Sequence, residues 1–451
     1  MNNSVLNFNS KEIKKIKNLK NMLGGKGANL AEMVKLGLPV PPGFIISTKI
    51  CDLFYKNKKK LPKKVLKKIL LELKVIEKLT NKKFGDLKTP LLVSVRSGAR
   101  VSMPGMMDTI LNLGLNDQTV KALTEKTLNG RFAKDCYRRF IQMYSNVVLN
   151  IEGHLFEEMI DNQKLNKGVL LDTELEESDL DELIQRFKEL VKKQTKKIFP
   201  QNVQEQLYGA INAVFLSWNS QRAKTYRKLN QISDHWGTAI NIQSMVFGNM
   251  GDQCSTGVVF TRNPSTGENV FFGEYLINAQ GEDVVAGTRT PLHITKKAKT
   301  IARSKEESME ETMPKVFQNL RKILYKLEKH YKDMQDVEFT VENKKLWILQ
   351  TRSGKRTAEA GIKIAVDMVK EKLISKKEAI LRIDPNTLDT LLHPALDKKV
   401  KKNVIARGLP ASPGAASGKV VFSAEEAERL NGMMQNTILV RVETSPEDIH
   451  G

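Results

Sequence analysis

The sequence is poor in cysteine and has no long apolar run. Its 451 residues contain three cysteines, Cys51, Cys136 and Cys254, which are far apart and form no CxxC pair. Neither a disulfide framework nor a zinc site is therefore indicated. No apolar run approaches the ~18 residues of a membrane span, and the N-terminal segment lacks the apolar core of a secretory signal. We expect a cytoplasmic protein that does not enter a membrane.

Aromatic residues are also few, at 6% of the chain, whereas Lys and Arg exceed Asp and Glu by 73 to 51 and give a formal net charge of +22. Clustered cations suit phosphate contacts with nucleic acid. Here, however, the lysines are spread along helix-like segments that often contain glutamate, and no nucleic-acid-binding motif accompanies them. Solvated helix faces explain most of the charge, so we expect no nucleic-acid partner.

The chain is long enough for about two to four domains of ~100–200 residues each. Helix-like and strand-like patterns alternate along it and predict an α+β fold in five parts. These are a mixed N-terminal part (1–116), a largely helical part (117–236), a β-rich part (237–355), a helical linker (356–402) and the start of an α/β unit (403–451).

Two glycine-containing segments in the N-terminal part suit contact with an anion. The first is Gly24-Gly25-Lys26-Gly27, predicted as a loop before a short helix. Glycines allow close backbone approach, a helix start offers N–H groups, and Lys26 adds a full charge. The second is SVRSGARVSMPGMMDT (94–109), where an apolar strand runs into a loop that contains Arg96. Either segment alone would more often be a surface turn than a binding site.

A hairpin in the β-rich part carries charged residues on one face. Strand periodicity places Asp336 and Glu338 on one face of the first strand, and Gln350 and Arg352 on one face of the second. A three-residue turn (343–345) would set Glu338 opposite Gln350 and Asp336 opposite Arg352, and would leave an apolar wall that includes Trp347 and Leu349. Two carboxylates beside an amide and an arginine suit Mg²⁺ with bound phosphates, although an exposed cross-strand salt bridge would show the same pattern.

Taken together, these segments resemble the nucleotide-binding half of the pyruvate phosphate dikinases and, more loosely, the phosphoenolpyruvate synthases. The resemblance covers nearly the whole chain and is carried by GGKGANLAEM, PVPPGF, SVRSGA, SMPGMMDTILNLG, GVVFTRNPSTGE, GEYLINAQGEDVVAG, DVEFT, LQTR, GLPASPGAASG and ETSPEDI. It implies an ATP-grasp nucleotide-binding domain with a helical insertion, in which two lobes clamp ATP and Mg²⁺. The start of a swivelling phosphohistidine domain would follow.

The resemblance also implies roles for individual residues. Lys26 and Arg96 resemble the phosphate-binding cations, and Glu282 is similar to an acidic residue near the nucleotide ribose. Glu338 and Gln350 resemble the pair that positions metal and nucleotide. The residues beside that pair in the polyphosphate site are Asp336, which we expect to be a second metal ligand, and Arg352.

One part of the family's machinery is missing from the 451 residues. The family transfers phosphate through a histidine in a Thr-Ser-His-Ala context, and none of the six histidines (154, 235, 293, 330, 393, 450) has it. The complete enzyme would convert ATP, phosphate and pyruvate to AMP, pyrophosphate and phosphoenolpyruvate, and would form a homodimer only through C-terminal regions outside this chain. We therefore expect the chain to bind MgATP but to be catalytically incomplete. The alternative is a stand-alone nucleotide-binding or regulatory module.

Overall fold

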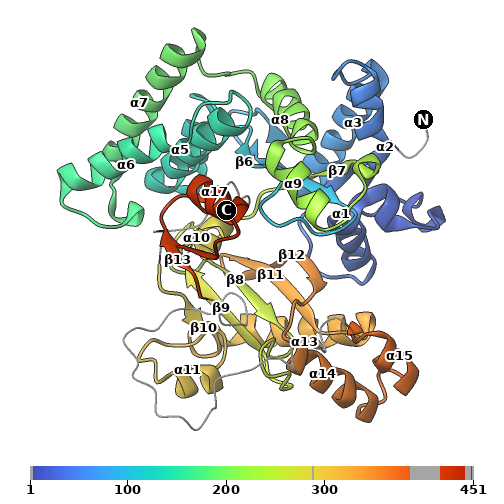
Figure 1. Ribbon diagram of the computed structural model, residues 1–451. Coiled ribbons are helices and arrows are strands. Elements are labelled where there is room, and N and C mark those ends of the chain that lie inside the picture. Colours follow the sequence, from blue (N-terminus) through green and yellow to red (C-terminus); the bar gives the residue numbers. More distant parts are fainter. Residues whose placement is uncertain (1–3, 287–288, 386–416, 442–447, 449–451) are drawn as a thin grey trace. The chain divides into compact units, whose positions relative to one another are not determined.

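The structure, a computed structural model, describes residues 4–286, 289–385, 417–441 and 448 (Figure 1). It contains both helices and sheets, which confirms the α+β class. The chain divides into two compact units. Unit 1 comprises Met1–Thr256, Leu276–Arg289 and Phe339–Gln350, and unit 2 comprises Gly257–Tyr275, Thr290–Glu338 and Thr351–Gly451.

Unit 1 contains a five-stranded antiparallel sheet of order β1-β2-β7-β5-β6. Its strands are β1 (Val5–Asn7), β2 (Gly43–Ile46), β5 (Val93–Ala99), β6 (Thr109–Leu113) and β7 (Thr238–Ser244). Because side chains alternate along a strand, Phe44, Val95 and Ile242 lie on one face, in the main hydrophobic core. The opposite face carries Arg96 and Asn241.

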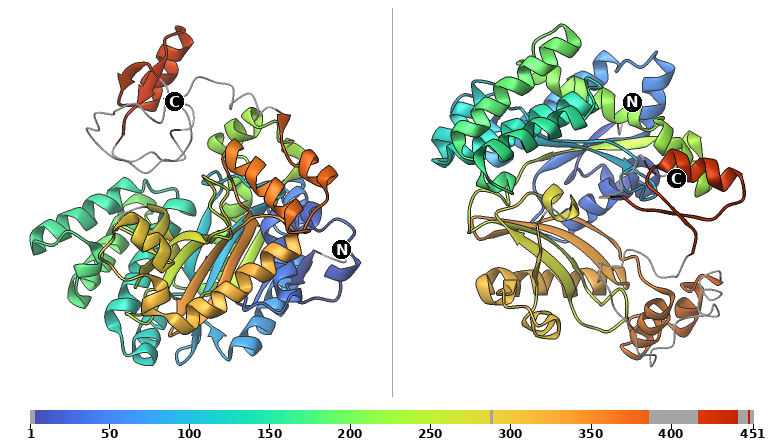
Figure 2. Two further views of the ribbon diagram at one scale, coloured as in Figure 1. Left: turned by 90° about the horizontal axis from the view of Figure 1, so that it is seen from below. Right: turned by 60° about the vertical axis from the view of Figure 1, so that its left-hand side comes forward.

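Helices cover both faces of this sheet. On the core face they include α3 and α8, whose apolar residues Ile69, Leu73 and Val214 are fully or almost fully buried. The α-helices of unit 1 include, in chain order, α1 (Leu19–Lys35), α2 (Thr48–Lys56), α3 (Lys63–Thr80), α4 (Thr119–Thr127), α5 (Gly130–Val147), α6 (His154–Lys167), α7 (Glu177–Thr195), α8 (Val203–Ser217), α9 (Gln221–Leu229) and α10 (Gly281–Ala286). The right-hand view of Figure 2 shows the teal and green helices of 119–217 along one side of the sheet. Helix α1 lies on the other face, where its glycines approach β5 and β7.

A second five-stranded sheet has the order β10-β9-β8-β11-β12. Its strands are β8 (Ser255–Phe260), β9 (Phe272–Ile277), β10 (Leu292–His293), β11 (Gln335–Glu342) and β12 (Lys345–Ser353). Strands β11 and β12 form a hairpin. The helices of unit 2 that precede it are α11 (Lys296–Ala302), α12 (Met309–Thr312) and α13 (Pro314–Tyr331), and those that follow it are α14 (Ala358–Lys370) and α15 (Lys376–Leu381). Arg262 follows β8, is fully buried, and pairs with Glu328 at 2.8 Å and Glu371 at 2.6 Å. A buried arginine needs such partners because an unpaired buried charge is very costly.

The last described segment is a small α/β unit. Strands β13 (Lys419–Val421) and β14 (Thr437–Leu439) pair in parallel, and α17 (Ala424–Gly432) packs on them through Ala427 and Leu430. Val420 is 51% exposed and Phe422 69% exposed. The preceding segment GLPASPGAA of the resemblance lies outside the described residues.

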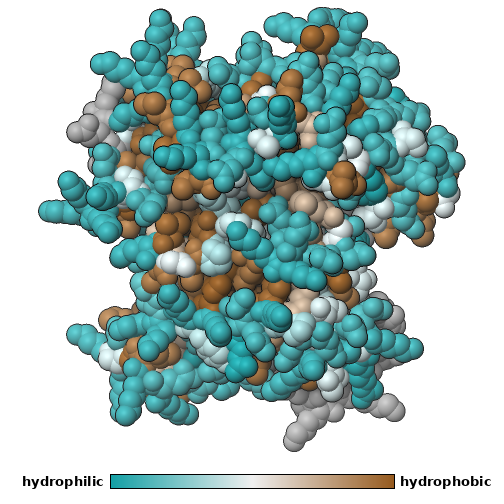
Figure 3. Space-filling model, turned by 180° about the vertical axis from the view of Figure 1, so that it is seen from behind, coloured by the Kyte–Doolittle hydropathy of each residue, from teal (hydrophilic) through white to brown (hydrophobic). Residues whose placement is uncertain are grey.

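Hydrophilic side chains cover most of the face seen in Figure 3, with hydrophobic side chains in patches among them. Within the described ranges, no helix is long and apolar enough to cross a membrane. The three cysteines are free and buried.

Candidate nucleotide site

The glycine segment is a kink inside a helix rather than the loop that the sequence predicted. Helix α1 runs through it, and only Gly24 departs from helical geometry, with φ 69° and ψ 171°. A Cβ on Gly24 would lie 1.7 Å from the carbonyl oxygen of Gly98 on β5. Glycine is therefore required both for the positive φ and for the close approach. The helix restarts at Gly25 and Lys26, and a helix start is where backbone N–H groups face an anion.

Arg96 lies within β5, the strand against which this kink packs, and not in the loop that the sequence predicted, because the strand continues to Ala99 through its pairing with β7. Arg96 and Asn241 are register partners on β5 and β7, so their side chains share a face of the sheet. A Cβ on Gly27 would lie 2.9 Å from Asn241 Oδ1, which places α1 on that same face. Lys26 and Arg96 are both half-buried. Unit 1 thus brings the two predicted phosphate-binding cations to one face of one sheet.

The loop after β5 is tied down at its far end. Asp108 forms an ion pair with Arg222 of α9, and its backbone N–H donates to Ser217 Oγ at 3.2 Å. Arg222 Nε also donates to the carbonyl oxygen of Met106 at 3.3 Å, and the Met106 side chain is buried. Asp108 and the methionine therefore anchor the loop. Sequence reasoning missed Arg222, because only the tertiary fold brings α9 to this loop.

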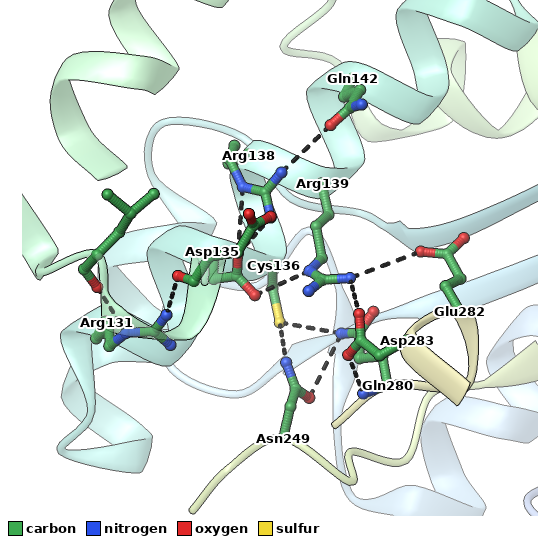
Figure 4. A network of polar contacts seen from close by, with 12 residues as sticks. Arg131, Asp135, Cys136, Arg138, Arg139, Gln142, Asn249, Gln280, Glu282 and Asp283 are labelled. Carbon is green, nitrogen blue, oxygen red and sulfur yellow. Dashed lines mark hydrogen bonds and ion pairs between the residues drawn. The ribbon is translucent and has the colours of Figure 1, made fainter. Parts of the chain in front are cut away.

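Glu282 stands at the start of α10, in the polar network of Figure 4. Arg139 of α5 donates to Asp283 at 2.8 Å and lies 4.0 Å from Glu282. Asp135, one helical turn earlier, accepts from Arg139 at 2.9 Å and from Arg138 at 2.7 Å. These two arginines lower the pKa of the buried Asp135 well below its usual range, against the effect of burial. Asp135 is thus an anionic anchor that holds Arg139 toward α10.

The same network orients Glu282 within unit 1. Burial raises the pKa of Glu282, whereas the charges of Arg139, Arg138 and Arg96 act to lower it. Sequence reasoning did not single out Asp135 and Arg139, although carboxylate and guanidinium at i and i+4 on a helix are a recognisable pair.

A pocket of about 580 Å³ adjoins the network. Its lining includes basic residues, among them Arg139, Lys164 and Arg289, and acidic residues, among them Glu157 and Glu282. A mixed lining of this kind suits a polar ligand that carries both hydrogen-bond donors and negative charge.

In unit 2, three of the predicted site residues lie together. Arg352 Nε donates to Asp336 Oδ2 at 2.7 Å, and Arg352 Nη2 lies 3.9 Å from Glu338 Oε1. Asp336 is 5% exposed, and burial raises its pKa while Arg352 lowers it. The other oxygen of this carboxylate, Oδ1, is buried and has no hydrogen-bond partner. Asp336 and Arg352 are therefore ion-paired, although the turn that was predicted to set them directly opposite one another is not the one observed.

The predicted three-residue turn of this hairpin is wrong. The strands end at Glu342 and begin again at Lys345, so the turn is Asn343-Lys344, and both residues have positive φ, 47° and 63°. Two left-handed residues give the tight turn whose twist suits a hairpin. Near the turn Leu346 and Ile348 are therefore buried, instead of the predicted Trp347 and Leu349. Gln350 itself is 7% exposed and belongs to unit 1.

The acidic residues of the hairpin fit a magnesium ion. Among the described residues there is no group of three or more His, Cys, Asp and Glu side chains that could hold a metal. Mg²⁺ is commonly bound by only one or two carboxylates together with substrate phosphates and water. The unpartnered Asp336 Oδ1 is an oxygen of the required kind. Asp336 and Glu338 would hold the ion, which would neutralise phosphate charge.

The fold and these groups define an α+β chain with a basic glycine segment and an acidic hairpin. Residues 20–373 match the family described as "Pyruvate phosphate dikinase, AMP/ATP-binding domain". The chain belongs to this family. It is 55% identical over 429 residues to a pyruvate, phosphate dikinase of Rhizobium meliloti, covering 95% of the chain and 48% of the relative. It is 52% identical over 436 residues to the pyruvate, phosphate dikinase of Clostridium symbiosum, covering 96% of the chain and 48% of that relative. The chain thus spans about half the length of these curated relatives.

Proposed function

We propose that the chain is the ATP- and magnesium-binding half of a pyruvate phosphate dikinase, with an ATP-grasp fold. The complete reaction takes ATP, phosphate and pyruvate to AMP, pyrophosphate and phosphoenolpyruvate. The observation that carries the proposal is the hairpin cluster of Asp336, Glu338 and Arg352, in which a buried carboxylate oxygen has no protein partner. The dikinase relatives support the same conclusion.

The residues of unit 1 have complementary roles in this proposal. Lys26, Arg96 and the restarted helix at Gly25 bind negative phosphate, and the support is that α1 packs on the face of the sheet that carries Arg96. Glu282, held by Arg139, accepts hydrogen bonds from a ribose hydroxyl. Gln350 positions the nucleotide together with Glu338.

The catalytic step requires a group that this chain lacks. In the dikinase reaction a histidine attacks the β-phosphate of ATP and releases AMP. The cations described above stabilise the charge of the polyphosphate, which lowers a barrier only when a nucleophile is present. We assign that histidine, the pyruvate site and the dimer contacts to regions outside the 451 residues. The segment from residue 403 is proposed as the start of the swivelling domain, and the five parts predicted from the sequence as its domain division.

A cytoplasmic location is proposed as well. All three cysteines are free and buried, as is usual for proteins of a reducing compartment.

Titration calorimetry with MgATP tests the proposal. The purified chain should bind MgATP, and Arg352→Ala should weaken binding about tenfold or more, since a hydrogen bond to a charged group contributes ~1.5–3 kcal/mol. Arg356→Ala is the matched control, because Arg356 pairs with Asp333 in unit 2 at 2.7 Å but belongs to no predicted site. A folded wild-type chain that binds no MgATP would refute the function, and equal losses in both variants would refute the site.

A further inference from the structure

Asn241 has an unusual environment for a buried amide. It lies in the middle of β7, is 1% exposed, and neither its Oδ1 nor its Nδ2 has a hydrogen-bond partner. A buried polar group without a partner costs ~1–3 kcal/mol, so each such group in a folded protein calls for an explanation.

The neighbours of this amide are the two glycine-containing elements of the phosphate-binding side. A Cβ on Gly27 would lie 2.9 Å from Asn241 Oδ1, and a Cβ on Gly98 would lie 2.6 Å from Nδ2. The carboxamide is therefore held between helix α1 and strand β5. Gly98 is also the residue whose carbonyl oxygen the Gly24 kink approaches. The amide lies directly beneath the glycine segment 24–27, which carries Lys26.

Asn241 is also the register partner of Arg96. Directly opposite residues on antiparallel strands have Cβ atoms about 4.5–5.5 Å apart and project to the same face. A single polar position on β7 therefore adjoins both predicted phosphate-binding cations, one through the sheet and one through α1.

We propose that Asn241 is a positioning residue of the nucleotide site. Its carboxamide hydrogen-bonds the backbone of the glycine segment 24–27 when a nucleotide polyphosphate binds to Lys26 and Arg96. This inference rests on the proposed function and adds a residue to it. The carboxamide offers both donor and acceptor beneath the segment, and the proposed bonds form when α1 moves at the Gly24 kink. Hydrogen bonds made only in the bound state favour that state, because they strengthen binding without stabilising the free chain.

The test compares binding with stability. Asn241→Ala should weaken MgATP binding about tenfold in calorimetry, as expected for two neutral hydrogen bonds. Its urea midpoint without nucleotide should be no lower than that of the wild type, because a partnerless buried amide has been removed. Ser145→Ala is the matched control: Ser145 Oγ in α5 is also buried without a partner, and this variant should keep the wild-type Kd.

Two results would overturn the assignment. One is a Kd for Asn241→Ala within about twofold of wild type, and the other is weaker binding accompanied by an equivalent loss of stability, which would indicate a structural role. If the variant does not fold, hydrogen exchange of the wild-type chain tests the proposed hydrogen bonds directly. With ¹⁵N-labelled asparagine, saturating MgATP should slow hydrogen exchange of the Asn241 carboxamide, and an unchanged rate would exclude the proposed bonds. If the wild type binds no MgATP, the proposed function has failed instead.

Discussion

Replacing Gly24 by alanine tests whether the kink in α1 requires glycine for space as well as for its backbone angle. The new Cβ would lie 1.7 Å from the carbonyl oxygen of Gly98 and 3.3 Å from that of Ala99. Both are backbone atoms of β5, which is paired on both sides within its sheet. Neither can move without shifting the strand, so α1 or β5 must be displaced.

The magnitude can be separated into two contributions. The conformation of Gly24, φ 69° and ψ 171°, is essentially restricted to glycine and costs ~1–3 kcal/mol at another residue, less ~0.4–1 kcal/mol gained because alanine restricts the unfolded chain. Steric overlap in a packed interior adds typically ~1–3 kcal/mol, and more where the backbone must shift. The variant should therefore lose roughly 1–5 kcal/mol of unfolding free energy.

Gly37→Ala is the control that isolates the overlap. Gly37 has φ 72°, nearly that of Gly24, but a Cβ there would meet nothing within 4 Å. This variant should show the cost of a positive φ without any steric overlap. Urea unfolding of both variants and MgATP titration of the folded fraction give the comparison. Equal stability losses, or unaltered MgATP binding in Gly24→Ala, would refute the role assigned to the close approach.

Three further predictions concern the hairpin, the chemistry and the last segment. Asp336→Asn should abolish tight MgATP binding. Because burial raises the pKa of Asp336, its ionisation disfavours the folded state, so the variant should be increasingly more stable than the wild type as pH rises above about 4. Thermal melts in which the stability of the wild type rises relative to the variant over this range would contradict the prediction. Incubated alone with MgATP and phosphate, the chain should form no AMP. It should form AMP when a separate polypeptide carrying the family's histidine domain is added. AMP together with a phosphohistidine on one of its own six histidines would show that the chain does contain the catalytic histidine. Hydrogen exchange should be fast across 419–421 and 437–439, because two short strands and one helix bury too little surface to offset their ordering entropy. Strong protection of these amides would show that the small unit is stably folded and would contradict the prediction.

Local patterns in the sequence were enough to predict many of the elements. The strands β2 (Gly43–Ile46), β8 (Ser255–Phe260) and β13 (Lys419–Val421) lie in parts of the chain where the sequence pattern alone is strand-like. Each is a short apolar run next to turn residues, a signal contained within a few positions. The ion pair between Asp336 and Arg352 was also predictable, because a hairpin brings residues close in sequence to one another.

The errors came from geometry that side-chain patterns do not encode. Asn343-Lys344 does not have the Asn-Gly form that marks a two-residue turn, yet both residues adopt left-handed angles. The glycine segment was predicted as a loop before a short helix, but only Gly24 leaves helical geometry. The packing of α1 on β5 makes up for the weak helix propensity of the others.

The site residues that sequence reasoning missed depend on contacts between distant segments. Arg222 reaches Asp108 across 114 positions, and Arg139 reaches Asp283 across 144. Asn241 had no signal at all, since Ala-Ile-Asn-Ile-Gln is an ordinary alternating strand in which the asparagine would be expected to face water. Only the fold shows that this polar face is covered by α1.

Partnerless buried atoms alone do not mark a site, because Ser145 Oγ is one and adjoins no predicted ligand group. What distinguishes Asp336 and Asn241 is a second relation: one is ion-paired with Arg352 and the other is the register partner of Arg96. In each case a group that weakens the free chain lies beside a cation predicted to bind phosphate. Local rules of stability are expected to fail at functional positions. Asp336→Asn and Asn241→Ala should therefore both reduce MgATP binding without destabilising the chain, whereas Ser145→Ala should leave binding unchanged.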